Sequence, residues 1–393
     1  MSKDDKKVNR VGITGLSKRD KRSLAILIGI GIAAIVVLVV VVVLLGERAG
    51  EEAAPQQTVE VEAEAEEPVV ETHEGEAISP LTGTYIKEGW VTKRPVALMI
   101  ENTTMSLPQY GLNSCGVIYE CPVEGGITRL MGISDAYHKL KQFGNVRSCR
   151  PYYVYLAAEY DAIYCHVGQS VHGQEVLNTG IVDDLNAMDG DISNTVFYRT
   201  SDKKAPHNCF TSGKAIDEGI KTKDYRKKYD EGYRPHFSFI DEDEEAIPDG
   251  EDAAVVCPYF LNNKPYFVYN KKTGTYDRYQ FGDKQIDAID NKQVSVKNII
   301  YQTSASNTSL YSGTDYVNIP LVGDGEGMFF SGGKAAKITW EKESDTAQTK
   351  FYYEDGSEIE LAPGQTWICL IEKQYMDKNS YYATVKDYDN RAQ

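Results

Sequence analysis

The sequence predicts an α+β protein, in which a layered mixed α/β sandwich domain precedes a β-rich domain and a single N-terminal transmembrane helix carries both. Three observations support this class. Residues 24–45 form a long uncharged apolar run. Residues 93–220 mix short apolar runs with segments of helical period. Residues 236–371 contain short runs rich in Val, Ile, Tyr and Phe without helices between them.

The apolar run "LAILIGIGIAAIVVLVVVVVLL" (24–45) is long enough to cross a membrane. Its 22 residues span roughly 33 Å as a helix, and a bilayer core is about 30 Å thick. A cleaved signal peptide is the alternative, but its apolar region usually has only about 7–15 residues. Residues 1–23 contain eight Lys or Arg and three Asp, so the positive-inside rule places this tail in the cytoplasm. We therefore expect a single-pass anchor in the cell membrane with all later residues extracytoplasmic.

Residues 46–79 are predicted to be a disordered acidic stalk. They contain eleven Glu, one Arg and no aromatic residue, so they cannot bury enough apolar surface to offset the entropy of ordering. The remaining chain is also acidic, which makes non-specific nucleic-acid binding an improbable function.

The first extracytoplasmic domain is expected at residues 80–240. Apolar runs at 94–101, 115–121, 127–134 and 162–168 predict strands, and Gly125–Gly126 predicts a turn before the third of these runs. Residues 150–161 have helical spacing, with Pro151 suited to the first turn. Two further helices are expected at 170–179 and 211–220, the latter capped by Thr211 or Ser212.

The second domain is expected at residues 241–393, with the boundary near residue 240 at the charged segment "DEDEEAIPDGED" (241–252). Strand-like runs bounded by Gly, Asn or Asp predict an antiparallel β domain, and "EDGSEIE" (354–360) contains an Asp-Gly hairpin signal. The glycine-rich "GDGEGMFFSGG" (323–333) has no helix pattern after it, so it predicts a hairpin rather than a phosphate-binding loop.

Seven cysteines lie in the extracytoplasmic part, mostly in apolar surroundings that favour buried thiols, and one disulfide between Cys115 and Cys121 is possible on spacing alone. There is no C-x-x-C motif, and no His pair has the spacing of a helical zinc site. We expect neither a metal nor another cofactor.

Chargeable residues concentrate between residues 93 and 209, next to Gly or Pro. Arginine donates in a fork that matches a carboxylate or phosphate, and Arg147 and Arg150 lie three apart before the predicted helix. Amides of that helix's first turn would add to an anion site. Glu120 shares a strand face with Ile118, so it is expected to point inward and to need a partner. The alternative is a purely structural network in which glutamates neutralise the arginines.

Several motifs resemble the YerB-like family of envelope lipoproteins, which contains domain of unknown function 3048. They are "PLTG" (80–83), "RPVALMIEN" (94–102), "VIYECPVEGGITR" (117–129), "VRSCRPYYV" (146–154), "APHN" (205–208), "GDGEGMFFSGGKAAKITW" (323–340) and "LAPGQTW" (361–367). The resemblance covers most of residues 80–371. It implies an extracytoplasmic protein with an α+β domain and then a β-rich one, and no established activity. The family often has a lipid-modified cysteine where this chain has the apolar run, and Cys149 replaces a smaller residue.

The resemblance favours a ligand site over a structural network, because the family motifs contain more polar residues than an ion pair requires. The expected function is binding of an anionic envelope component, a phosphate or a carboxylate. The expected ligand-binding residues are Glu101, Arg129, Arg147, Ser148, Arg150 and Asn208. The first alternative is an envelope hydrolase with Arg stabilising developing negative charge, whose catalytic acid and base come from Glu120, Glu124, His166 and His207. The second is a protein or glycan interaction scaffold that uses the tyrosines of the β-rich half.

Overall fold

The computed structural model describes residues 73–391 except 242–243, 248 and 312. The expected tail, the anchor at 24–45 and most of the expected stalk lie outside the described residues. Glu76–Ile78, at the end of the expected stalk, form strand β1 and pair with β2 (Tyr85–Lys87). Within the described part of the chain, no helix is both long and apolar enough to cross a membrane.

The first half contains the expected strands and helices. The strands at the expected positions are β3 (Val96–Asn102), β4 (Val117–Pro122), β5 (Thr128–Ser134) and β7 (Ile163–His166), and β8 (Asp184–Asn186) is a further strand that was not predicted. The helices are α2 (Pro151–Ala158), α3 (Val171–Leu177) and α4 (Gly213–Thr222). Pro151 occupies the first turn of α2, whereas Ser170 and Ser212 cap α3 and α4 through their side chains. Short strands β6 (Phe143–Gly144), β9 (Tyr198–Arg199) and β10 (Cys209–Thr211) form a separate small sheet.

The second half is rich in strands, as expected. Its longer strands are β14 (Tyr266–Asn270), β15 (Thr275–Gln280), β20 (Asn298–Ser304), β23 (Gly323–Ser331), β24 (Lys334–Lys342), β25 (Lys350–Tyr353) and β27 (Thr366–Glu372). The hairpin β21 (Asn307–Tyr311) and β22 (Thr314–Asn318) lies between β20 and β23 in sequence. The glycine-rich 323–333 run is β23 and the turn of the expected hairpin, because Gly332 and Gly333 have positive φ between β23 and β24.

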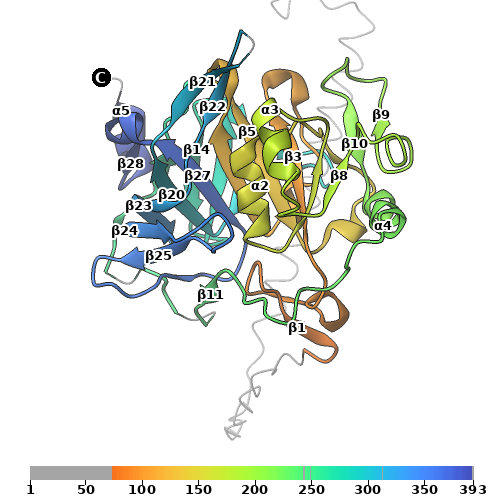
Figure 1. Cartoon of the computed structure of the whole chain (residues 1–393). Coiled ribbons are helices and arrows are strands. Elements are labelled where there is room, and N and C mark those ends of the chain that lie inside the picture. Colours follow the sequence, from red (N-terminus) through yellow and green to blue (C-terminus); the bar gives the residue numbers. More distant parts are fainter. Residues whose placement is uncertain (1–72, 242–243, 248, 312, 392–393) are drawn as a thin grey trace, which may run out of the picture. The chain divides into compact units, whose positions relative to one another are not determined.

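One eleven-stranded sheet passes through both halves of the chain (Figure 1). Its order is β12-β24-β23-β20-β27-β4-β5-β3-β7-β8, with β25 beside β24 and β12 at Glu251–Asp252. The expectation of a purely antiparallel second half is wrong at β27, which pairs in parallel with both β20 and β4. Strand β27 is buried on both faces, which is typical of parallel strands inside a sheet.

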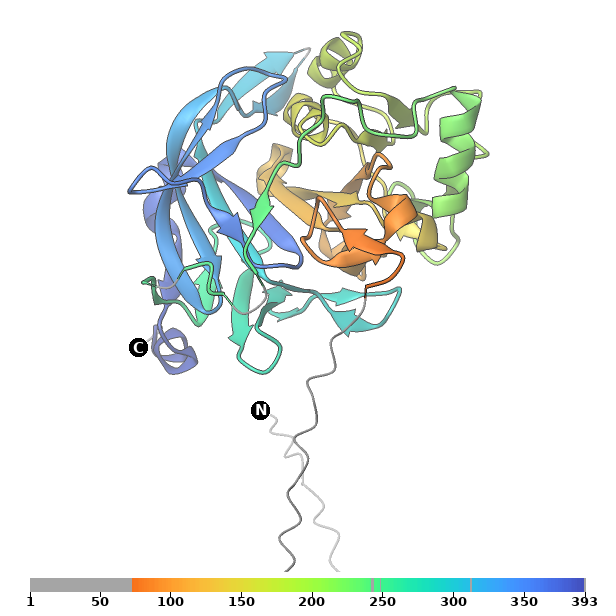
Figure 2. The same ribbon diagram turned by 90° about the horizontal axis from the view of Figure 1, so that it is seen from below.

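Different elements pack against the two faces of the sheet. Helix α2 packs on the face of Tyr119, Met131 and Ile368, and α3 lies beside α2 (Figure 1). The opposite face, with Ile118, Leu130 and Trp367, packs against α4 and against the smaller sheet built around β14 and β15. Seen from below, most strands of the second half (blue) lie on one side and α4 (green) lies on the other (Figure 2). Strict alternation along β4, β5 and β3 sends neighbouring side chains into these two separate cores.

Candidate functional site

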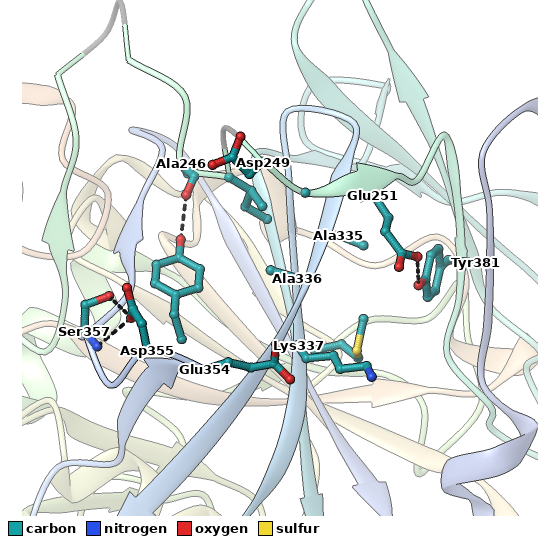
Figure 3. A pocket seen from close by; sticks show the side chains of 14 residues that line it. Ala246, Asp249, Glu251, Ala335, Ala336, Lys337, Glu354, Asp355, Ser357 and Tyr381 are labelled. Atoms are coloured by element: carbon teal, nitrogen blue, oxygen red, sulfur yellow. Dashed lines mark hydrogen bonds between the residues drawn. The ribbon is translucent and has the colours of Figure 1, made fainter.

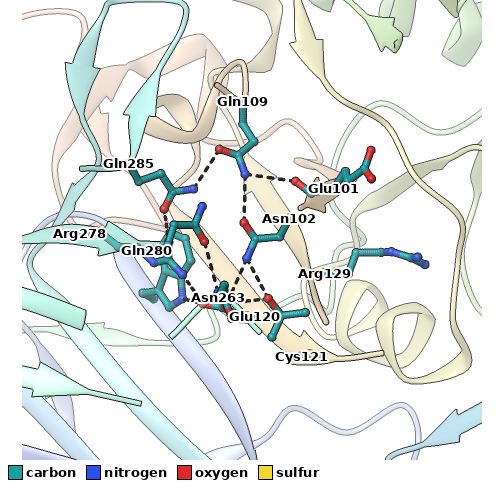
Figure 4. Close-up of polar contacts among 12 residues, drawn as sticks. Glu101, Asn102, Gln109, Glu120, Cys121, Arg129, Asn263, Arg278, Gln280 and Gln285 are labelled. Carbon is teal, nitrogen blue, oxygen red and sulfur yellow. Dashed lines mark hydrogen bonds and ion pairs between the residues drawn. The ribbon is translucent and has the colours of Figure 1, made fainter. Parts of the chain in front are cut away.

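The expected polar residues divide between the two faces of the sheet. Glu101 and Cys121 are both cross-strand partners of Arg129, so these three side chains share one face. Asn102 and Thr128 form the next cross-strand pair and lie on the opposite face, together with Glu120. The sheet therefore separates Glu120 from Arg129, and Figure 4 shows Arg129 directed away from the network around Glu120.

Glu120 is fully buried in an ion pair that joins the two halves of the chain. Its Oε2 lies 2.6 Å from Nη2 of Arg278 on β15, and it also accepts from Trp367 Nε1 at 3.1 Å. Arg278 is fully buried too, and its guanidinium carbon lies 4.1 Å from the centroid of the Trp367 ring. The other oxygen accepts from the side chains of Asn263 (2.7 Å), Thr128 (2.8 Å) and Asn102 (3.2 Å).

Buried amides extend this network. Gln109 donates to the Asn102 side chain at 3.1 Å, and Gln285 donates to Gln109 at 3.1 Å (Figure 4). Glu120 thus points inward as expected and has a partner, but that partner comes from the second half. Arg278 lies in the tyrosine-rich stretch "YDRY" (276–279) of the second half, for which the sequence predicted no contact with the first half. Both oxygens of Glu120 are occupied by five donors, an arrangement that suits a structural charge.

The arginines gather where β3 and β7 separate. The two strands pair in parallel from Val96 to Leu98, after which residues 145–149 enter the space between them. Arg147 donates its backbone N–H to Met99 O at 3.0 Å, and Val167 N–H donates to Arg147 O at 3.0 Å. Helix α2 begins directly afterwards, and no side chain caps its first turn. Crevices at the carboxyl ends of diverging parallel strands are common ligand sites in α/β sheets.

Arg129 is buried, and no carboxylate in the described part of the chain is its partner. Its side chain is 5% exposed, and its Nη1 donates to Ser148 O at 2.6 Å. None of the ion pairs formed among the described residues includes Arg129. Burial lowers the pKa of Arg129 to about 10, and repulsion from Arg150 and Arg147 contributes to the lowering. The backbone of Arg129 is fixed from α2, because Tyr153 donates its hydroxyl to Arg129 O at 2.5 Å.

Arg150 has a bidentate partner in Glu124. Nε of Arg150 lies 2.9 Å from Oε1 of Glu124, and Nη2 lies 2.6 Å from Oε2. Burial would raise the pKa of Glu124, but the hydrogen bonds and charge of Arg150 outweigh it and hold the pKa below its usual value. Hairpin β21–β22 also reaches this pair: Val317 N–H donates to Glu124 at 3.2 Å, and the Tyr316 ring centroid lies 5.9 Å from the Arg150 guanidinium. Sequence reasoning missed this contribution from the second half.

Glu101 and His207 form a close pair beside Arg147. Nδ1 of His207 lies 2.7 Å from Oε1 of Glu101, which also accepts from the Thr103 hydroxyl at 3.0 Å. Nε of Arg147 lies 4.0 Å from the other oxygen, Oε2 of Glu101. The structure therefore brings together Glu101, Glu124, Arg129, Arg147, Ser148, Arg150 and His207, to which we refer as the arginine cluster.

Two other expected site residues have their own local partners. His166 is buried and bridges Gly168 O (2.9 Å) and Asp184 (3.0 Å), which ties β7 to β8. Asn208 accepts from Arg199 Nη1 at 2.9 Å and donates to the backbone oxygen of Thr200 at 2.7 Å. Among the residues that the structure describes, no group of three or more His, Cys, Asp or Glu is placed to hold a metal ion.

A cleft of about 580 Å³ lies in the second half, between β12 and β25 over β24 (Figure 3). Ala335 and Ala336 are among its lining residues, and its rim is acidic. Its polar groups largely contact one another: the Tyr381 hydroxyl donates to Glu251 at 2.6 Å, and Ser357 donates to Asp355 at 2.6 Å. Because it contains no uncompensated buried charge, we place the candidate site at the arginine cluster instead.

Comparison with known proteins agrees with this architecture. Residues 81–226 match the family model described as "Protein of unknown function (DUF3048) N-terminal domain", and residues 255–368 match the corresponding C-terminal domain. The chain is similar to "Putative lipoprotein YerB" of Bacillus subtilis (strain 168), with 29% identity over 296 residues that cover 75% of this chain and 86% of the relative. A crystal structure of YerB from Bacillus subtilis superimposes with a TM-score of 0.68 at 27% identity, over 78% of this chain and 99% of that one. On these matches, the chain belongs to the DUF3048 family.

Proposed function

We propose that this protein is a membrane-anchored extracytoplasmic protein whose arginine cluster binds an anionic envelope ligand, a phosphate or a carboxylate. The observation that carries the proposal is Arg129, which is buried, forms no ion pair with a carboxylate of the described residues and lies near two other arginines. Three guanidinium groups gather around two carboxylates, those of Glu101 and Glu124. A bound anion would supply the missing negative charge.

The surroundings of Arg129 support binding rather than a closed structural network. Glu120 does not neutralise these arginines, because it lies on the other face of the sheet and forms its ion pair with Arg278 there. The 4.0 Å approach of Arg147 to Glu101 is too long for a hydrogen bond, so Arg147 retains donor capacity. The uncapped first turn of α2 adds partial positive charge at the same place.

Two observations support the proposed location: the name of the relative and the apolar run at residues 24–45 of this chain. The relative is named as a lipoprotein, which suggests attachment to the outer surface of the cell membrane. The first cysteine of this chain is Cys115, so no cysteine near residue 45 is available for lipid attachment. We therefore propose that residues 24–45 anchor this protein in place of a lipid.

Thermal unfolding of the purified full-length protein tests the proposal, with inorganic phosphate and N-acetyl-D-alanine as probes. A probe at a hundredfold excess over its Kd adds about 2.7 kcal/mol of stability and raises the midpoint by a few degrees. The shift should disappear in Arg147→Ala and remain in Arg234→Ala. Arg234 is a suitable control, because it lies outside the arginine cluster and its guanidinium donates to the backbone oxygen of its neighbour Tyr233. No shift with either probe in the wild type would contradict the proposal.

The pair of His207 and Glu101 supports a hydrolase as second candidate. A carboxylate 2.7 Å from Nδ1 can orient the imidazole so that Nε2 exchanges protons with a substrate, while the arginines stabilise negative charge. Release of p-nitrophenol from p-nitrophenyl phosphate would be measured for the wild type and for His207→Gln. Activity in the wild type that His207→Gln removes, with phosphate binding retained, would favour catalysis over binding alone.

A further inference from the structure

Glu101 places a buried acceptor without a partner inside the arginine cluster. Its side chain is 4% exposed, and Oε2 has no hydrogen bond within the described part of the chain. Nε of Arg147 is also buried and lacks an acceptor there. The two atoms lie 4.0 Å apart. A buried donor and a buried acceptor that both lack a partner carry a desolvation cost unless a third group satisfies them.

Packing fixes the position of this acceptor. Oε1 of Glu101 is held by His207 Nδ1 and the Thr103 hydroxyl, and the backbone oxygen of Glu101 accepts from Gln109 Nε2 at 3.2 Å. The strand itself is bound to residue 145, because Glu101 N–H donates to Asn145 O at 3.0 Å. Oε2 therefore cannot turn toward Arg147 without breaking these contacts. It is a preorganised acceptor.

The chemistry of the two atoms selects the group that would satisfy both. A carboxylate oxygen only accepts hydrogen bonds, and a guanidinium nitrogen only donates them. A fully ionised phosphate oxygen could accept from Arg147 but would be repelled by Glu101. An ammonium group could donate to Glu101 but would face three arginines. A hydroxyl group donates to one atom and accepts from the other.

We propose that the ligand of the arginine cluster is a hydroxylated phosphate, a polyol or sugar phosphate, whose carbon-bound hydroxyl lies between Glu101 Oε2 and Arg147 Nε. This inference rests on the proposed function and deepens it. The phosphate contacts Arg129 and the free donors of Arg147, and Glu101 discriminates against phosphates that lack the hydroxyl. The carboxylate thus contributes selectivity in a site whose affinity comes from arginine.

Isothermal titration of the full-length protein with two matched probes tests the inference. Glycerol 3-phosphate carries hydroxyl groups, and n-propyl phosphate has the same carbon chain without them. A hydrogen bond to a charged group corresponds to a preference of roughly tenfold to hundredfold, so glycerol 3-phosphate should bind tighter by such a factor. Equal affinities would overturn the inference and leave the proposed function standing, because water or the phosphate itself would then fill the gap. Failure of both probes to bind would overturn the proposed function and the inference with it.

Glu101→Gln separates selectivity from simple charge compensation. Loss of a negative charge should tighten binding of n-propyl phosphate, whereas loss of the carboxylate acceptor should reduce the preference for glycerol 3-phosphate. If Glu101→Gln increases the affinity for both probes by the same factor and keeps the wild-type preference for glycerol 3-phosphate, Glu101 is only a counter-ion and the inference fails. Arg147→Lys, which retains the charge but displaces the Nε donor, should lower the preference as well. The wild-type ratio tests the inference even if a variant does not fold.

Discussion

Replacing Glu120 with Gln should be among the most damaging conservative changes in this protein. The two side chains have the same shape, but Gln lacks the charge that neutralises Arg278 and has an amide nitrogen at one of the two oxygen positions. If the nitrogen replaces Oε2, it faces Arg278 and Trp367, which both donate. If it replaces Oε1, it faces three side-chain donors. In either orientation, at least two buried donors lose their acceptor.

The expected cost follows from burial. Removal of one partner from a fully buried ion pair costs about 3–5 kcal/mol, because the remaining charge is left in the interior without compensation. The matched control is Glu358→Gln. Glu358 lies 2.7 Å from Lys350, but both side chains are more than one third exposed. Such a surface pair contributes only about 0–1 kcal/mol.

Urea unfolding of the full-length protein, followed by tryptophan fluorescence, measures both changes. Trp367 lies in the network itself, so its emission reports directly on the affected region. Glu120→Gln should lower the midpoint strongly at an unchanged slope, and Glu358→Gln should leave it nearly unchanged. A destabilisation below about 1 kcal/mol for Glu120→Gln would refute the reasoning, since it would mean that the pair contributes no more than a surface one.

Three further predictions concern the rest of the fold. Burial would raise the pKa of Glu124, but Arg150 holds it below its usual value of 4.5. Ionised Glu124 therefore stabilises the fold at neutral pH. This contribution is lost as the pH falls below about 4.5 and through the folded-state pKa. Midpoints of the wild type and Glu124→Gln should thus differ near pH 7 and converge as the pH falls through the folded-state pKa of Glu124, and a constant difference would contradict this account. Gly213→Ala should lower the free energy of unfolding by about 1–3 kcal/mol in urea, because its Cβ would meet backbone atoms of Tyr137 and His138. In the control Gly89→Ala no atom lies near the new Cβ, so the free energy of unfolding should change by no more than about 0.5 kcal/mol. Equal effects of the two changes would argue against the clash. His166→Phe should destabilise by about 1–3 kcal/mol, because it removes the ring nitrogens that contact Gly168 O and Asp184, and should leave phosphate affinity unchanged in titration calorimetry. A large loss of affinity would instead place His166 in the site.

Local structure was predictable because its signals are local. Apolar runs and turn residues predicted β3, β4, β5 and β7, and the capping serine and the N1 proline predicted where α4 and α2 begin. Pairing between the halves was not predictable, because no local pattern in "TWICLIE" indicates a neighbour about 250 residues away. The expected division near residue 240 lies in the gap between the two family matches, and strand pairing continues on both sides of it.

The candidate site was predictable in composition but not in grouping. The arginines, Glu101, Glu124 and His207 lie together, whereas the sequence indicated only that chargeable residues concentrate between residues 93 and 209 next to Gly or Pro. Glu120 is four residues from Glu124 and was grouped with it, yet the alternation of β4 sends it to the other face. Tyr316 and Arg278 carried no signal, because their roles depend on tertiary contacts made by the second half.

Strand β27 has a consequence for how this protein can move and how it can be divided. Because it lies between β20 and β4 and pairs with both in parallel, the two family domains share one backbone hydrogen-bond ladder and cannot rotate against each other as hinged bodies. A fragment that ends near residue 240 would lack β27 and would expose the unpaired edge of β4, a strand that is buried along its whole length in the intact protein, and such an exposed edge favours aggregation. The recognisable boundary in the sequence is therefore a poor place to cut the molecule.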